Sequence, residues 1–359
     1  MLRPAQLDLS LIGHPLPWDL FTDSGVLVAG AGLVIADESH FLKLIGRPLF
    51  LKSDTGLAPG ALPDRLAELA RELERELSAD GALDPRQLRR IAADLEALGQ
   101  LDMDACLGYP RLVTLARPGV AHCLRVMFTA LFLADQMDIE EGERAGLGVA
   151  ALTMNLADLD LHDRLFSRPD PLTEAERAQL RAHPLRSVEC LARAGVDEAA
   201  WLETVAQHHE NMDGSGYPAG LSGAGIRLTA RILRVADTYC AKITGRHYRA
   251  PRSGRFALEE LFGREKGRLD SQIAILLLRR IGLYPPGTLV RLSNRESACV
   301  TRRGRGGALR FAVSFLDGRG RPLESPRERD LNHRSHQMRA LLDPEPAWPK
   351  IDWKRLWGY

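Results

Sequence analysis

The sequence predicts a mainly α protein in which a helical central domain lies between a β-rich N-terminal module and a β-rich C-terminal tail. Three successive patterns of apolar and polar residues support this prediction. Short apolar runs alternate with turn formers up to about residue 52, apolar residues then recur every three to four positions, and alternation returns after a Pro-Gly pair at 286–287. We expect the N-terminal module at 1–60, an amphipathic helical linker at 61–105, the helical domain at 106–285 and the tail at 286–359.

The N-terminal module is predicted from Asp23-Ser24-Gly25, which separates two strand-like runs; an irregular cap on the main domain is the alternative. In the linker, leucines recur at helical spacing at Leu66, Leu69, Leu73 and Leu77. Two amphipathic helices follow from this pattern. They pack either on each other or on a partner, which leaves a homodimer open.

The central pattern predicts five long helices and the tail predicts a β-hairpin. The expected helices span residues 121–138, 145–159, 173–194, 198–211 and 229–244. In the tail, Trp348, Trp353 and Trp357 are expected to dock it onto the rest of the molecule; lining an interface is the alternative.

Composition narrows the partners and the compartment. The formal net charge is +1, which gives no support for binding a nucleic-acid duplex through bulk charge. Five dispersed cysteines without a CxxC pair suit reduced thiols. The sequence lacks a secretion signal at its start and an apolar stretch long enough to span a membrane, so we expect a cytoplasmic protein without a membrane span.

The stretch HHENMDGSGYP, which begins at His208 and His209, is the most informative one for chemistry. Imidazoles and carboxylates at a helix end suit iron, manganese or zinc, and the glycines Gly214 and Gly216 permit a tight turn. Asp237 interrupts an apolar helix face, where a metal ion or a buried cation would offset its charge. A buried histidine pair with a structural role is the alternative.

Two arginines follow three residues apart, Arg246 and Arg249, and this spacing suits phosphate oxygens. Solvated surface arginines are the alternative. Upstream, His183 precedes a proline and His122 opens an apolar helix; each alone would fit a helix end or a core position.

The segment HHENMDGSGYPAGLSGAGIRLTARILRVADTYCAKITGRHYR resembles the HD-GYP family, bacterial HD-domain phosphohydrolases that cleave cyclic di-GMP in nucleotide signalling. The resemblance runs from about residue 109 to 295 and implies an all-helical HD-type core. It also implies a divalent metal, iron or manganese, and a cyclic di-GMP or related nucleotide ligand. A GGDEF-type protein partner is implied as well.

The resemblance assigns residues by motif. The implied metal ligands are His122, His183, His208, His209 and Asp237. The implied substrate-pocket positions are Asp213, Gly214, Gly216, Tyr217, Pro218, Arg246 and Arg249.

The chain departs from the family where the family has ALLHDIGK and this sequence has ALTMNLAD. Met154 replaces the His ligand, Asn155 the bridging Asp, and Asp158 a Lys. A thioether and a neutral amide are poor ligands for these ions, so we expect fewer ions than a complete family site holds. We also expect Asp158 to repel phosphate.

A relocated His-Asp pair is the alternative to loss, because His162-Asp163 follows eight residues later. Eight residues of continuous helix rise about 12 Å, and the pair aligns with a loop that we expect to be exposed. The sequence therefore favours loss over relocation.

Three hypotheses follow, and no catalytic residue is assigned. In the first, a degenerate HD-GYP protein binds a nucleotide or a protein with impaired hydrolysis. In the second, an active phosphodiesterase works with a reduced or altered metal site. In the third, the domain is a structural scaffold for oligomerisation. Whether the protein is an enzyme stays open at this point.

Overall fold

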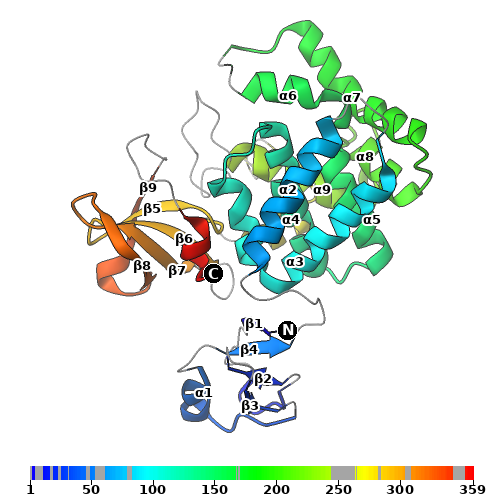
Figure 1. Cartoon of the computed structure of the whole chain (residues 1–359). Helices are drawn as coiled ribbons and strands as arrows, with labels where there is room; N and C mark the ends of the chain where they lie inside the picture. The colour runs from blue at the N-terminus through cyan, green and yellow to red at the C-terminus, as the bar shows by residue number, and fades with distance from the viewer. Residues whose placement is uncertain are drawn as a thin grey trace.

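The computed structural model describes residues 2–4, 11–16, 19–22, 26–30, 32–45, 49–52, 61–78, 83–166, 168, 170–243, 263, 265–281, 284–303, 309–342 and 352–359. Three bodies follow one another along the chain: a small sheet with one helix, a large helical domain and a second sheet (Figure 1). The predicted mainly α class, with β-rich parts before and after the helices, is confirmed.

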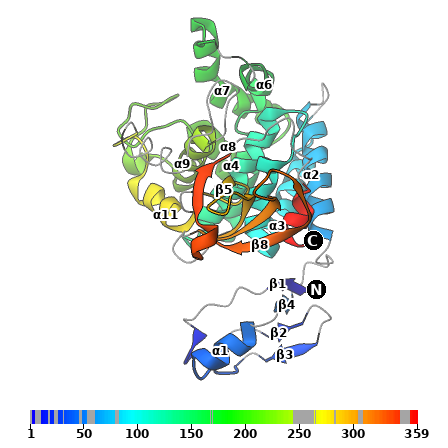
Figure 2. The same cartoon turned by 90° about the vertical axis from the view of Figure 1, so that its left-hand side faces the viewer.

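The N-terminal module is a four-stranded antiparallel sheet in the order β1-β4-β2-β3 with one helix. Its own small core includes Leu20, Ile35 and Phe41. Figure 2 shows the module below the helical domain. Its elements are β1 (Leu2–Pro4), β2 (Leu20–Phe21), β3 (Leu27–Ala29), α1 (Glu38–Ile45) and β4 (Phe50–Lys52).

The two amphipathic helices predicted for the linker are α2 (Leu62–Ser78) and α3 (Pro85–Leu112). Asp84 caps the start of α3 by accepting from the amide of Arg86. The leucine face of α2 is buried in the core of the helical domain. The helices therefore pack on each other and on the domain within one chain, as the first of the two expected arrangements requires.

The helical domain is built around α4, whose residues are buried almost throughout and which packs against α3, α5 and α9. A helix that is apolar on all sides suits the centre of a bundle. The helices of this part are α4 (Pro118–Asp135), α5 (Glu141–Thr153), α6 (Leu159–Phe166), α7 (Glu174–Arg193), α8 (Ala199–Gln207), α9 (Leu228–Ile243) and α11 (Ser271–Ile281).

The predicted helix at 145–159 is wrong in its second half, because α5 ends at Thr153. A turn at Met154 and Asn155 leads into a 3-10 turn, Leu156–Asp158, and then into α6. Tertiary bonds replace the helical ones: the Ala157 amide donates to Ser187 Oγ on α7 at 3.2 Å. Apolar periodicity continues across the break, so the sequence pattern did not reveal it.

The tail is a five-stranded antiparallel sheet in the order β8-β7-β6-β5-β9, followed by a short helix. This extends the predicted hairpin. Its elements are β5 (Leu289–Leu292), β6 (Ser297–Arg303), β7 (Leu309–Leu316), β8 (Pro322–Asp330), β9 (Met338–Leu341) and α12 (Trp353–Trp357).

The tail docks on α3 beside the helical domain (Figure 1). Arg302 pairs with Asp102, at a kink in α3, and the Tyr359 hydroxyl donates to the same carboxylate at 2.8 Å. The Trp353 ring meets Tyr109 edge-on at 4.9 Å. Docking by Trp353 and Trp357, both buried, is as expected, whereas Trp348 lies outside the described residues. In the described part of the chain, no helix is long and apolar enough to cross a bilayer.

Candidate metal centre and ligand cavity

A cavity of about 230 Å³ opens between α4, α6, α7 and α9. Leu165, Phe166 and Leu172 form an apolar part of its wall. Its polar wall consists of His122, Arg125, Asn155, His162, His183, His209, Tyr217 and Asp237. Concave sites of this kind, apolar with a few convergent polar groups, are typical ligand sites.

Three imidazoles converge at the α7 and α8 side of this cavity. One ligand atom from each of His183, His208 and His209 lies within 4.8 Å of the others. His183 comes from the middle of α7 and is 1% exposed, and His208 ends α8 and is wholly buried. The turn after α8 places His209 beside it, with ring centroids 4.2 Å apart.

The backbone fixes the tautomers of two of these rings. His183 Nδ1 lies 2.6 Å from the carbonyl oxygen of Leu180, and His208 Nδ1 lies 2.7 Å from that of Val205. A carbonyl oxygen only accepts, so each Nδ1 carries a hydrogen and each neutral ring presents its Nε2 lone pair. The two Nε2 atoms face each other at 3.1 Å.

Two lone pairs at that separation repel unless a proton or a cation lies between them. Nitrogen ligands about 2.0–2.1 Å from one ion lie roughly 3.0–3.4 Å apart at usual angles. The 3.1 Å separation of the His183 and His208 Nε2 atoms therefore fits ligands of a shared ion. Orientation of a ligating imidazole by a carbonyl at its other nitrogen is also typical of metal sites.

Burial keeps these rings neutral. Burial, and after it the nearby His183, lowers the pKa of His208 to about 3. The pKa of His183 is lowered, and that of His209 is lowered well below its ordinary value, in both cases mainly by burial. Neutral imidazole is the form that binds metal ions.

A second polar pair lies across the cavity, where His122 of α4 meets Asp237 of α9. His122 Nε2 and Asp237 Oδ1 are 2.8 Å apart. Burial alone would raise the pKa of Asp237, but the hydrogen bond to His122 and the nearby imidazoles outweigh burial and hold the pKa well below its ordinary value. Asp237 is therefore a carboxylate whose charge faces imidazoles. Both residues line the cavity.

The loop after His209 is shaped by Glu210, whose buried carboxylate accepts from the amides of Ala219 at 2.6 Å and Leu221 at 3.0 Å. Gly216 is required here, because a Cβ at this position would lie 2.3 Å from the Asn211 nitrogen.

The same loop brings the Tyr217 ring against His209, with centroids 4.8 Å apart. Of the loop residues expected to contact substrate, Tyr217 lines the cavity. Asp213 instead accepts from the amide and hydroxyl of Ser215, and Gly214, at φ +79°, continues that turn. Pro218 follows Tyr217 in the loop, outside the cavity wall.

Arg246 and Arg249, expected to bind phosphate, lie outside the described residues. The three replaced positions fall in different places. Met154 is wholly buried in the helical core, and the buried Asn155 lines the cavity.

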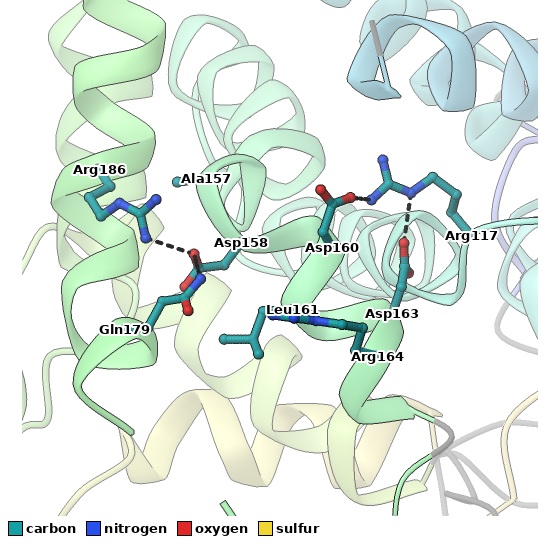
Figure 3. Close-up of a pocket in the computed structure, with 9 residues that line it drawn as sticks. All are labelled: Arg117, Ala157, Asp158, Asp160, Leu161, Asp163, Arg164, Gln179 and Arg186. Carbon is teal, nitrogen blue, oxygen red and sulfur yellow. Dashed lines mark hydrogen bonds and ion pairs between the residues drawn. The ribbon is translucent and has the colours of Figure 1, made fainter. Parts of the chain in front are cut away.

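The expectation that Asp158 would face and repel phosphate does not match the structure. Asp158 points to an outer cleft instead, where its Oδ1 accepts from Gln179 at 2.8 Å and Arg186 at 3.0 Å (Figure 3). The reason is the turn at 154–155, which directs the 3-10 turn toward α7.

Sequence reasoning considered His162 only as part of a relocated His-Asp pair, and favoured loss over relocation. Because α5 ends and α6 folds back against α4, the 12 Å separation expected along a continuous helix does not apply. The His162 ring lines the cavity, with its centroid 6.4 Å from that of His122 and 6.2 Å from that of His183. Asp163 holds α6 to the start of α4, accepting from the Gly119 amide at 2.7 Å. The His-Asp dipeptide itself was the only signal in the sequence.

Comparison with known proteins agrees with this geometry. Residues 102–273 match the family model described as an HD domain. The matched residues include the cavity and all three converging imidazoles.

Several relatives of the chain are phosphodiesterases by name. The chain is 25% identical to the cyclic di-GMP phosphodiesterase PA4108 of Pseudomonas aeruginosa, over 99% of this chain and 87% of that protein. It is 29% identical to the cyclic di-GMP phosphodiesterase response regulator RpfG of Xanthomonas campestris, over 53% of this chain and 51% of that protein. It is also 29% identical to 3'3'-cGAMP-specific phosphodiesterase 1 of Vibrio cholerae, over 45% of this chain and 38% of that protein. The chain thus spans most of the first relative and about half or less of the other two.

Proposed function

We propose that the HD domain binds a cyclic dinucleotide, cyclic di-GMP or a related molecule, at a divalent ion held by His183, His208 and His209, and that its hydrolysis is impaired. The observation that carries the proposal is the facing pair of Nε2 atoms at 3.1 Å, fixed by backbone carbonyls at both Nδ1 atoms. Iron or manganese is the expected ion, as in the family that the sequence resembles.

The composition of the cavity wall supports the proposal that hydrolysis is impaired. Phosphodiester cleavage in a bimetallic site needs two ions at a fixed spacing, and a bound ion would supply an activated water and neutralise phosphate charge. Asn155 stands where the family has the bridging carboxylate, and an amide offers no charge to hold a second ion. His122 and Asp237 remain, but they are hydrogen-bonded to each other.

The nucleotide is proposed from the relatives. Two of the three proteins compared are named for cyclic di-GMP and the third for 3'3'-cGAMP. Both ligands share a ring closed by two phosphodiesters, so the charge and chemistry expected in the cavity are the same for either. Tyr217 could then stack on a base, as aromatic side chains do in other nucleotide sites.

A slow phosphodiesterase is the second candidate, and His162 favours it. This imidazole reaches the same cavity as His122 and Asp237 and adds a donor that the family pattern does not include. The position of His162 supports a metal site whose ligands have changed over a metal site that has been lost.

Turnover and binding of cyclic di-GMP separate the two candidates. Protein purified anaerobically with iron or manganese is incubated with cyclic di-GMP, and products are read by chromatography; binding is measured in parallel by calorimetry. We expect saturable binding, at least one equivalent of metal and little product.

The His208→Ala variant is the control, with an expected loss of metal and of any product. Metal-dependent linear product in the wild type alone would favour the slow phosphodiesterase. Absence of both binding and product for cyclic di-GMP and 3'3'-cGAMP would contradict the proposal.

A further inference from the structure

Arg125 is a buried cation in the wall of the ligand cavity. It lies on α4 three residues after His122, so both side chains lie on one face of the helix. Arg125 is 9% exposed, and it lines the cavity together with His122 and Asp237. Among the described residues that line this cavity, Arg125 is the one arginine or lysine.

The charge of Arg125 is not balanced by a carboxylate within the described part of the chain. Its Nη1 donates to the Pro110 carbonyl oxygen at 2.8 Å, and its Nε is buried without a hydrogen-bond partner. The acid that shares the cavity, Asp237, is hydrogen-bonded to His122 instead. Buried charges are normally paired, because an unpaired one loses its hydration without compensation.

The surroundings of Arg125 add positive potential. Burial lowers the pKa of Arg125 to about 10, and the neighbouring Arg111 contributes to the lowering. The guanidinium therefore stays protonated at neutral pH and lies near a second cation. An anion in the cavity would find two kinds of partner: imidazoles on one side and a desolvated guanidinium on the other.

We infer that Arg125 binds a phosphate oxygen of the ligand and supplies the positive charge that the family takes from the Lys replaced here by Asp158. The inference rests on the proposed function for the identity of the ligand, a phosphodiester. A planar guanidinium suits this role, because its N–H groups match two phosphate oxygens and bonds to charged groups are the strong ones. The nucleotide would then lie between the imidazoles and the α4 guanidinium.

The test compares cyclic di-GMP affinity, by calorimetry with manganese present, for the full-length wild type, Arg125→Met and Arg125→Lys. We expect Arg125→Met to weaken binding at least tenfold with unchanged metal content. Arg125→Lys should lose several-fold, because it keeps the charge but not the planar group. Arg111→Met is the matched control: it removes a neighbouring guanidinium that also has a buried, unbonded Nε but does not line the cavity, and should change affinity less than threefold.

Several outcomes overturn the inference. If Arg125→Met fails to fold, Arg125→Lys decides, and wild-type affinity in that variant counts against the role. Equal losses in Arg125→Met and Arg111→Met would indicate a structural effect of removing buried charge.

Failure of the proposed function is distinguishable from failure of this inference. If the wild type binds no cyclic dinucleotide, inorganic phosphate becomes the probe and thermal stability the readout. A phosphate-dependent rise in melting temperature that disappears in Arg125→Met supports the anion site. An equal rise in both proteins, or no rise in the wild type, overturns it.

Discussion

Two walls of one cavity, the imidazole wall and the turn wall, differ in what their polar groups do. The imidazole wall is the cluster of His183, His208 and His209, of which His183 and His209 line the cavity. His183 and His208 are buried and present fixed lone pairs toward each other, and His209 is half-buried. On the turn wall, residues 154–158, Met154 joins the hydrophobic core and Asp158 bonds outward to α7. Only Asn155 on that wall lines the cavity.

The difference indicates that the polar groups of the two walls have different roles in the molecule. On the imidazole wall, backbone carbonyls orient the rings of His183 and His208 so that their Nε2 atoms face each other, which suits ligands of one ion. Groups of the turn wall hold the fold: Asp158 binds Gln179 and Arg186, one turn to either side of His183 on α7. Of the three replaced residues, Asp158 thus supports the helix that carries His183.

The largest effect expected from this comparison is on stability at the turn wall. Asp158→Ala should lower the free energy of unfolding by about 2.5 kcal/mol, because a buried carboxylate loses charged hydrogen bonds to Gln179 and Arg186. Denaturant titration by circular dichroism measures it. Asp160→Ala is the control: that side chain is 91% exposed, and the expected change is below about 0.5 kcal/mol. Equal effects would mean that Asp158 supports nothing.

Much of the fold could be predicted from the sequence, because helical periodicity is a local property. The bounds of α4, α7 and α9 agree with the pattern within a few residues. The end of α5 could not be predicted, since it depends on the bond from Ala157 to Ser187, thirty residues away along the chain. Long-range hydrogen bonds leave no periodic trace.

The site was predicted in part, and for a different reason. The motif resemblance, not the spacing, brought His122, His183 and Asp237 together. The contribution of His162 needs the reversal of the chain into α6. The importance of Arg125 appears only when its partners are known, since the sequence shows an arginine but not whether an acid faces it.

A smaller effect is expected on the imidazole wall when the pH falls. The pKa of His208 is lowered to about 3 in the folded chain, against an ordinary value near 6.5. Below pH 6.5 the unfolded chain therefore takes up a proton that the folded chain refuses, so stability is lost as the pH falls toward 3. Between pH 7 and 5 this amounts to roughly 2 kcal/mol for His208 alone.

Chemical denaturation in EDTA at pH 7 and pH 5 measures the loss of stability. The His208→Gln variant should lose less stability between these two pH values than the wild type. His333→Gln, which changes an exposed ring in the loop between β8 and β9, is the control and should follow the wild type. A pH dependence that is the same in wild type and His208→Gln would contradict a buried neutral imidazole.

The smallest expected effect concerns Asn155, which is the turn-wall residue that lines the cavity. Asn155→Asp restores a carboxylate at the one turn-wall position that lines the cavity, and should tighten manganese binding about tenfold through added charge. In EDTA the same variant should be less stable than the wild type, because the new charge is buried without an ion. Calorimetry with Mn²⁺ measures the first effect, and Asn332→Asp, at an exposed site, controls for net charge.

A tenfold gain in manganese affinity would mean that the walls differ by one missing charge, with the position of the backbone preserved. Unchanged affinity would mean that the turn has moved the side chain out of reach of the imidazoles, and that restoring the family residue cannot restore the site.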